Sequence, residues 1–367
     1  MLHRREILAA LTLAAFARPA IAKSGDHRDR ALDAAFREHA PPALAAAIVT
    51  REGLEWSGVR GVRRFGANDQ AVLDDVWHLG SCTKAMTAAL YGRLVEQGRA
   101  QWRSTIQELF PDIAVHPGWT SATISSLLMH RAGMSDGSWL TDDWLRMAQR
   151  DKIDLRKQRR DLVTRVVERP PAHQAGSLEY SNLDYIIVGA AIEAIAAESW
   201  ETVMRRELFA PLGIKSGGFG AAHGRVPWPH RNTDTIPLPI DPDRSDSDNP
   251  AVIGPAGTVH MSLQDYARFV RMILKEGDGF LSRETVQTLT TPFGSESPDY
   301  ALGWVVVRDR PWAKGIMLGH EGTNTLNHAY CAIAPAIGKA VIAFSNDGMR
   351  GAMATVAVAR SLAATLT

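Results

Sequence analysis

Ser81 and Lys84 are the two residues of this chain whose types and spacing best suit covalent chemistry. Apolar residues at helical spacing follow them as far as Gly98, so the sequence predicts a helix that begins at Ser81. Residues three apart share a helix face, which lets the Lys84 amine reach the Ser81 hydroxyl. Free N–H groups at a helix N-terminus also favour the oxyanion that forms when a serine attacks an acyl carbon. Because S-x-x-K arises by chance in many helices, the pair needs support from elsewhere in the chain.

Tyr180 and Asn182 are a second pair with suitable chemistry. They follow a segment rich in proline and glycine and open a predicted helix at Leu183, so both side chains can point the same way. A neighbouring cation would favour the Tyr180 phenolate, which could then act as a general base. The Asn182 amide offers a donor and an acceptor that could orient Lys84 or substrate. Taken alone, this triplet is more typical of a turn and a helix cap.

The third motif is His320-Glu321-Gly322, which we place between two predicted strands. Glycine at this point would let substrate approach the strand backbone. The N–H of Thr323 could then complete an oxyanion hole with the N–H of Ser81. By itself, the triplet is more simply interpreted as a connecting loop.

Together the three motifs resemble those of a known group. S-x-x-K, Y-x-N and H-x-G, in this order and at these separations, resemble the serine β-lactamase and penicillin-binding-protein superfamily. The nearest branch is the class C β-lactamase-like group, which includes D-alanyl-D-alanine carboxypeptidases, D-aminopeptidases and serine esterases. Residues 127–134, 211–214 and 254–257 also resemble segments of that group, and the likeness extends over about residues 30–365.

The resemblance implies a role for each motif residue. Ser81 would be the acylated nucleophile, Lys84 and Tyr180 would share proton transfer, and Asn182 would orient substrate. The sequence leaves open whether Lys84 or Tyr180 is the base. The other expected substrate-binding residues are those of the third motif: His320, Gly322 and Thr323.

The third motif departs from the family's K-T-G pattern, in which lysine and threonine help to hold a carboxylate. His320 titrates at about 6.5 unless its surroundings change this, and Glu321, if it points into the cleft, should repel carboxylates. We therefore predict an exported serine hydrolase that forms an acyl-enzyme on Ser81 and hydrolyses an ester or amide, of esterase or D-amino-acid peptidase type. A true class C β-lactamase or D-Ala-D-Ala carboxypeptidase is the first alternative. A non-catalytic, penicillin-binding-like protein is the second.

The order of the predicted elements indicates an α+β, β-lactamase-like fold. Predicted strands lie near both ends of the chain, at residues 43–50, 54–61, 302–308, 328–334 and 339–345. We expect them to form one antiparallel sheet flanked by helices, with residues of about 29–95 and 290–367 in this α/β part. Residues of about 96–289 would form an inserted, mainly helical part, with the cleft between the two parts. Within it, the proline-rich residues 227–257 predict a long irregular loop.

Residues 1–22 have the pattern of a signal peptide. Arg4 and Arg5 precede a short apolar run and a small-residue cleavage pattern at residues 20–22. Paired arginines in this position resemble a twin-arginine export signal. We therefore expect residues 23–367 to be the mature domain, located in the periplasm, with no stable membrane insertion after cleavage.

The composition narrows the class of partner. A net charge of +1 without a basic cluster argues against nucleic acid, and a small-molecule ester, amide or peptide-like substrate fits the motifs. The histidines lack metal-site spacing, so we expect no metal and no cofactor. Cys82 and Cys331 are too few for a disulfide scaffold, and we expect Cys82 to be buried. Residues 133–137 match the G-x-S-x-G nucleophile elbow, but no predicted strand precedes Ser135, which that motif requires.

Overall fold

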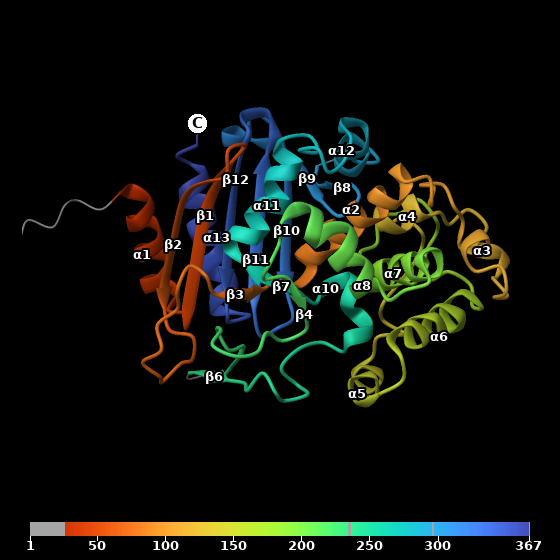
Figure 1. Cartoon of the computed structure of the whole chain (residues 1–367), viewed down its shortest axis with the longest axis horizontal. Coiled ribbons are helices and arrows are strands. Elements are labelled where there is room, and N and C mark those ends of the chain that lie inside the picture. Colours follow the sequence, from red (N-terminus) through yellow and green to blue (C-terminus); the bar gives the residue numbers. More distant parts are fainter. Residues whose placement is uncertain (1–25, 234–235, 296, 367) are drawn as a thin grey trace, which may run out of the picture.

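The central sheet of the molecule joins the two ends of the chain (Figure 1). The computed structural model describes residues 26–233, 236–295 and 297–366, so the expected signal peptide lies outside the described residues. The sheet has the strand order β2-β1-β12-β11-β10-β9-β8, with antiparallel pairing throughout. Its strands are β1 (Ala43–Thr50), β2 (Leu54–Gly61), β8 (Asp299–Tyr300), β9 (Val305–Arg310), β10 (Gly315–Thr323), β11 (His328–Ala334) and β12 (Lys339–Ser345). The predicted α+β fold, with an antiparallel sheet from both chain ends, is confirmed.

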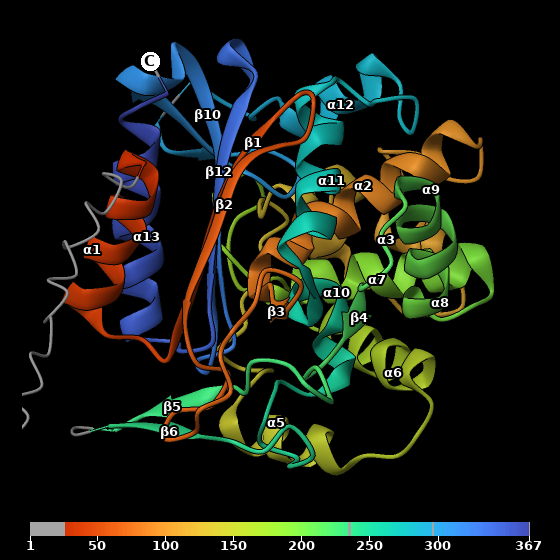
Figure 2. The same ribbon diagram turned by 60° about the vertical axis from the view of Figure 1, so that its left-hand side comes forward.

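Two terminal helices, α1 (His27–His39) and α13 (Arg350–Ala363), cover one face of this sheet. Figure 2 shows them side by side against β1, β2 and β12. Strand β1 is apolar on both faces because both faces are buried. Leu44, Ala46 and Ile48 belong to the core under α1 and α13, whereas the intervening residues belong to the core on the opposite face. The period of two thus assigns β1 to the interior of the molecule.

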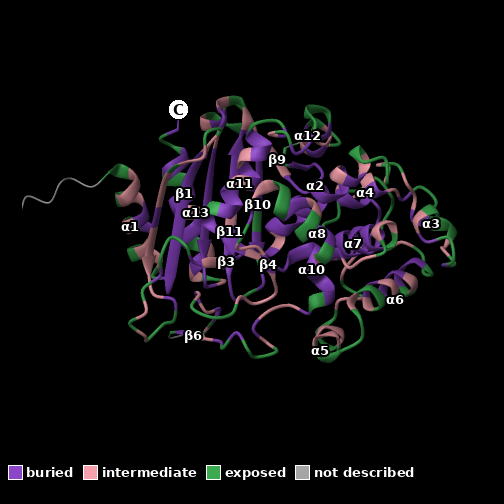
Figure 3. Ribbon diagram, viewed as in Figure 1, coloured by how far each residue is buried: buried purple, intermediate pink, exposed green. Residues whose placement is uncertain are grey.

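The opposite face of the sheet is covered by α11 (Leu263–Leu274), beyond which lie the remaining helices. Figure 3 shows buried residues extending from the sheet into α2 (Thr83–Glu96), α7 (Asn182–Ala196) and α10 (Gly254–Gly257). The helices around this group are α3 (Ile106–Leu109), α4 (Ile124–Leu128), α5 (Asp142–Arg150), α6 (Leu155–Val167), α8 (Trp200–Met204), α9 (Ala210–Leu212) and α12 (Arg283–Thr290). Helices α2 and α7 are buried around most of their circumference, as expected for helices inside a domain.

Two small sheets complete the fold. The first consists of β3 (Val76–His78), β7 (Val259–Ser262) and β4 (Gly218–Phe219), and the second is the hairpin of β5 (His230–Asn232) and β6 (Pro237–Pro239). The predicted loop at residues 227–257 is therefore only partly irregular, since it contains β5, β6 and α10. Within the described residues, no helix is long and apolar enough to cross a membrane.

Close packing of α7 on α10 shapes the interior near the nucleophile. A Cβ atom at Gly189 of α7 would lie 2.2 Å from Pro255 Cγ, so only glycine permits this approach. Thr87 Oγ1 of α2 donates a hydrogen bond to Pro255 O at 2.8 Å. Helix α10 is thereby held between α2 and α7, which brings the Ala256 carbonyl toward the side chains that α2 presents.

Candidate active site

Ser81 lies in a 3-10 turn, η1 (Gly80–Cys82), that leads directly into α2. Gly80 has a φ of 49°, and a Cβ atom there would lie 2.3 Å from Thr323 N. A Cβ atom at Gly322 would lie 2.7 Å from Ser81 N. These two glycines let the nucleophile turn touch the end of β10. The backbone nitrogens predicted to form an oxyanion hole, those of Ser81 and Thr323, therefore lie at one junction.

The side chain of Lys84 is fully buried, and its Nζ contacts three oxygen atoms. It lies 3.0 Å from Ser81 Oγ, 2.8 Å from Asn182 Oδ1 and 2.8 Å from Ala256 O. Burial lowers the pKa of Lys84 to about 7, although two nearby carboxylates act in the opposite direction. A large fraction of Lys84 is therefore neutral at physiological pH, which a general base must be.

The partners of Lys84 determine where its neutral amine directs the lone pair. Ala256 O can only accept a hydrogen bond. Asn182 Oδ1 also accepts, because the amide nitrogen of Asn182 is bonded to Asp136 Oδ2 at 2.9 Å. These two acceptors use the two N–H bonds of the neutral amine. The lone pair then faces Ser81 Oγ, in the direction required to take its proton.

Asp136 holds Asn182 in this orientation. Its Oδ2 accepts from Asn182 N at 3.0 Å and from Asn182 Nδ2, while its Oδ1 accepts from Ser181 Oγ at 2.6 Å and from Leu183 N at 3.1 Å. The carboxylate therefore caps the N-terminus of α7, where negative charge is favourable. Sequence reasoning did not assign this role, because Asp136 is 46 residues from Asn182 and a cap is normally sought in adjacent residues.

Tyr180 places its hydroxyl 2.9 Å from Ser81 Oγ. The residue is 46 % exposed, yet burial of its surroundings raises its pKa above the usual value, while the Ser81 hydrogen bond acts in the opposite direction. Lys84 Nζ lies 4.8 Å from the ring centroid. The raised pKa disfavours the Tyr180 phenolate, which is one of the two bases that the sequence left open. A protonated Tyr180 is a proton donor at this site.

His320 is 5 % exposed and lies on β10, which pairs with β9 on one side and with β11 on the other. Its Nδ1 is 2.7 Å from Glu321 O and its Nε2 is 2.8 Å from the Tyr300 hydroxyl. Because a carbonyl oxygen only accepts, we assign the ring hydrogen to Nδ1, and Nε2 accepts from Tyr300. Burial lowers the pKa of His320 to about 4. The imidazole is thus neutral at neutral pH and supplies no cation to the cleft.

Glu321 lies on the opposite face of β10 from His320. Its carboxylate is 3.6 Å from His328 Nε2, and His328 Nδ1 is 2.7 Å from Thr355 Oγ1 of α13. Neighbouring residues of a strand point to opposite faces of the sheet, so Glu321 faces α13. The repulsion of substrate carboxylates that Glu321 would exert from inside the cleft is therefore absent.

Comparison with known proteins gives a match to the beta-lactamase family over residues 28–364. The chain belongs to the beta-lactamase family. Penicillin-binding protein 4 of Amycolatopsis lactamdurans is 26% identical over 343 residues, which cover 88% of this chain and 85% of that protein. Esterase EstB of Burkholderia gladioli is 25% identical over 369 residues, which cover 90% of this chain and 92% of the esterase.

Other relatives are longer or more distant. Unguisins hydrolase ungD of Aspergillus violaceofuscus is 26% identical, and the match spans 83% of this chain but only 58% of that protein. The structure of the D-amino acid amidase of Ochrobactrum anthropi SV3 matches with a TM-score of 0.73 at 18% identity, covering 93% of this chain and all of the amidase. That structural likeness confirms the fold. The beta-lactamase family comprises serine hydrolases, and the match to it covers residues 28–364 of this chain.

Within this beta-lactamase-family site, His130 belongs to the segment of residues 127–134 that resembles the family. It is fully buried, with its ring centroid 4.4 Å from that of Tyr180 and 4.6 Å from that of Tyr300. Its Nδ1 is 2.7 Å from Asp184 Oδ2. Burial lowers the pKa of His130 and raises that of Asp184. His130 is thus structural, but it packs directly behind Tyr180 and limits where that ring can lie.

Ser135, the other candidate nucleophile, lies in a segment without the strand and helix of a nucleophile elbow. Its Oγ accepts from Gly137 N at 3.4 Å and, among the residues that the structure describes, has no hydrogen bond to a base. Cys82 and Cys331 are both buried and unpaired, as expected for Cys82. Of the sequence-predicted site residues, the structure brings Ser81, Lys84, Tyr180 and Asn182 into direct contact and places His320, Gly322 and Thr323 along the adjoining strand.

Proposed function

We propose that this protein is an exported serine hydrolase that cleaves an ester or amide through an acyl-enzyme on Ser81. One observation carries the proposal. Ser81 Oγ lies between Lys84 Nζ at 3.0 Å and the Tyr180 hydroxyl at 2.9 Å. The first of these groups has its pKa lowered to about 7 and the second has its pKa raised. A nucleophile between a base and an acid whose pKa values have moved apart is the arrangement that acyl transfer requires.

The reaction follows from these positions. Neutral Lys84 takes the Ser81 proton as Oγ bonds to the acyl carbon, and the C=O electron pair moves onto oxygen, beside the N–H groups of Ser81 and Thr323. When the C=O re-forms, the C–O or C–N bond breaks and the leaving group takes a proton from Tyr180, which the Lys84 ammonium restores. Water then attacks the acyl-enzyme with Lys84 again as the base. The products are the free acid, the alcohol or amine, and the original enzyme.

The neutral imidazole of His320 supports an ester or amide rather than a β-lactam as substrate. Lysine is the residue whose permanent charge helps to hold a carboxylate at this position in the resembled family, and His320 is uncharged at neutral pH. The names of the relatives, an esterase and a D-amino acid amidase, fit the same assignment. The likeness to penicillin-binding protein 4 supports the alternative, a β-lactamase or carboxypeptidase activity, which the experiment must exclude.

A side-by-side assay tests the proposal. Purified protein is given p-nitrophenyl butyrate, a chromogenic cephalosporin and D-alanine p-nitroanilide, and a slow acylating substrate is followed by intact-mass spectrometry. We expect hydrolysis of the ester, far slower cephalosporin turnover, and an adduct that maps to Ser81. Ser81→Ala should abolish both signals, whereas the matched control Ser135→Ala should change neither. Efficient cephalosporin hydrolysis, or an adduct on another residue, would overturn the assignment.

Export is the second part of the proposal and rests on the sequence of residues 1–22. Arg4 and Arg5 support the twin-arginine route, which carries folded proteins across the bacterial inner membrane. Cell fractionation of the full chain in a bacterial host tests it. We expect the activity of the wild type in the periplasm. After the double change Arg4→Lys and Arg5→Lys, we expect the activity in the cytoplasm instead. Equal periplasmic activity of both would argue against this route.

A further inference from the structure

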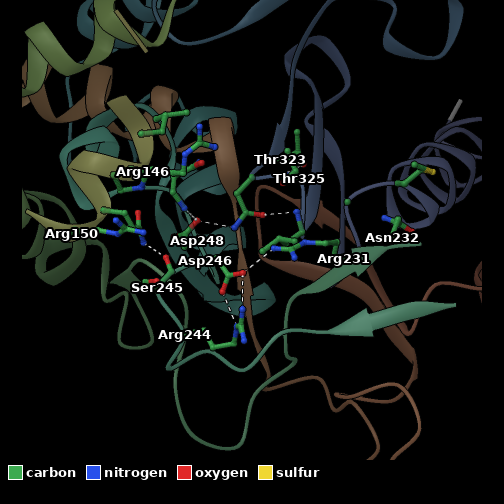
Figure 4. A pocket seen from close by; sticks show the side chains of 18 of the residues that line it. Arg146, Arg150, Arg231, Asn232, Arg244, Ser245, Asp246, Asp248, Thr323 and Thr325 are labelled. Carbon is green, nitrogen blue, oxygen red and sulfur yellow. Dashed lines mark hydrogen bonds and ion pairs between the residues drawn. The ribbon is translucent and has the colours of Figure 1, made fainter. Parts of the chain in front are cut away.

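A cavity of about 1030 Å³ lies next to Thr323, the last residue of β10. It is lined by α5, by residues of the 231–232 and 244–250 segments, and by the turn at residues 323–326 that follows β10. Figure 4 shows these lining side chains, which include four arginines, and we call it the arginine cavity. Thr323 belongs to its wall. A Cβ atom added at Gly80 would lie 2.3 Å from Thr323 N, so Thr323 also packs directly against Gly80. The cavity therefore shares Thr323 with the junction between β10 and η1.

Within the described residues, the four arginines of the arginine cavity have fewer carboxylate partners than there are guanidinium groups. Arg231 Nη2 at 3.0 Å and Arg244 Nε at 2.8 Å share the single carboxylate of Asp246. Arg146 pairs with Asp143, a residue whose side chain is 94% exposed, so solvent weakens that pair. Arg150, exposed at the end of α5, forms no ion pair with any residue that the structure describes.

The second acidic residue of the lining does not balance these cations. Asp248 Oδ1 accepts from Asn324 Nδ2 at 2.7 Å, and its Oδ2 lies 2.9 Å from His78 Nε2. Gly80 N in turn donates to His78 Nδ1 at 3.1 Å. Both oxygens of Asp248 are thereby bonded to His78 and Asn324 and do not pair with any arginine that the structure describes. The lining therefore keeps more guanidinium groups than carboxylates that pair with them. Guanidinium groups are suited to carboxylates because they present two parallel donors.

Part of the cavity wall is apolar. Leucine, proline, methionine and alanine side chains contribute to the lining: Leu145, Pro250, Leu326, Met349 and Ala352. Gln149 of α5 donates to Ser245 O, which joins the helix to the loop across the cavity. A site with apolar walls and cationic groups at the rim matches a carbon chain that ends in an anion.

Strand β10 indicates which part of a substrate enters the arginine cavity. Tyr180, the proposed proton donor to the leaving group, lies toward His320, with the two ring centroids 6.3 Å apart. Thr323 is three residues farther along β10, which is about 10 Å on an extended strand, and Gly322 beside Ser81 N lies between them. The leaving group belongs on the Tyr180 side, so the acyl group extends toward the cavity.

We infer that the arginine cavity binds the acyl group of a substrate that carries a carboxylate at its far end, with Arg150 and Arg146 as the principal contacts. The inference rests on the proposed function for the direction of the acyl group. In this arrangement the cations that meet a substrate carboxylate lie on α5, whereas position 320 of β10 carries a neutral histidine.

Mono-p-nitrophenyl esters of succinate, adipate and suberate, compared with p-nitrophenyl butyrate, hexanoate and octanoate, test the inference. Each pair has equal chain length and differs only in the terminal carboxylate. We expect kcat/KM for the anionic ester to exceed that of its neutral partner by about fivefold or more at the best length. Arg150→Gln, and more strongly Arg146→Gln with Arg150→Gln, should lower this ratio toward one. The matched control Arg283→Gln removes an exposed arginine of α12 and should leave the ratio unchanged.

A binding arm separates this inference from the proposed function. Suberate and octanoate are titrated calorimetrically into the Ser81→Ala protein, which binds without turnover. Tighter binding of suberate that Arg150→Gln removes would support the inference even if no ester were hydrolysed, in which case only the proposed function fails. Hydrolysis of neutral esters with no preference for anionic ones, or a preference that Arg283→Gln reduces equally, would overturn the inference and leave the proposed function standing.

Discussion

Asp136 Oδ2 lies 2.9 Å from Asn182 Nδ2, and this bond decides which end of the Asn182 amide faces Lys84. With the nitrogen engaged, Asn182 Oδ1 is 2.8 Å from Lys84 Nζ and can only accept. The Asp136 carboxylate, in the loop between α4 and α5, thus controls the direction of the lone pair on Lys84 Nζ of α2. Asp136 is a positioning residue, since it touches neither Ser81 nor the expected place of the substrate.

Replacing Asp136 tests this relationship. In Asp136→Asn, one side of the new amide presents N–H groups to the N–H groups of α7, so Asn182 loses its fixed orientation. We expect kcat to fall about 10- to 100-fold while KM changes little, and the helix cap to lose about 1 kcal/mol of stability. Kinetics and urea unfolding measure the two effects. Asp143→Asn on exposed α5 is the matched control, and an equally slow Asp143→Asn enzyme would contradict the positioning role.

Lys84 and Tyr180 should behave as a unit. Each of Lys84→Ala and Tyr180→Phe should slow acylation by about 100- to 10,000-fold, because each removes one half of the proton transfer through Ser81. The double variant should be little slower than the slower single variant. Single-turnover acylation measured by rapid-quench mass spectrometry gives the comparison. If the two losses multiplied, the shared proton transfer would be wrong.

The pH dependence of acylation should report Lys84. A base must be unprotonated, so kcat/KM should rise about tenfold per pH unit below about 7 and level off above it, because burial lowers the pKa of Lys84 to about 7. Burial raises the pKa of Tyr180, so its deprotonation should reduce activity only at strongly alkaline pH. His320→Gln serves as the control. The rise in kcat/KM toward pH 7 should persist in His320→Gln, because the pKa of His320 is about 4. If the rise disappeared in this variant, it would have to be assigned to His320.

Substitution at position 320 should change substrate preference, and substitution at 321 should not. His320→Lys introduces a cation on the cleft side of β10, so the ratio of cephalosporin to p-nitrophenyl butyrate hydrolysis should increase. Glu321→Thr alters a side chain that faces α13 and lies 3.6 Å from His328, so the ratio should stay the same. Both ratios come from the same chromogenic assay. A shift caused by Glu321→Thr alone would mean that Glu321 reaches the cleft in solution.

Local spacing was sufficient to find the residues that we propose to react. Ser81 and Lys84 are three apart on a helix, and Tyr180 and Asn182 stand where α7 begins, so their directions follow from elements that the sequence predicts. The strands at both chain ends were predicted because alternation and apolar runs are also local. Strand β10 was not, since Gly315, Gly319 and Gly322 interrupt its pattern. Only the folded chain explains Gly322, because the backbone of η1 packs against it.

Burial and distant contacts were decided by the tertiary structure alone. No pattern within a few residues shows that Ala256 O, or Asp136 through Asn182, would direct the Lys84 amine. The sequence by itself determined the set of proton-handling groups but left open whether Lys84 or Tyr180 is the base. Desolvation favours Lys84 as the base, because removing water from Lys84 and Tyr180 penalises the charged form of each. How much water a side chain loses depends on every segment that packs around it, and that is a property of the folded chain.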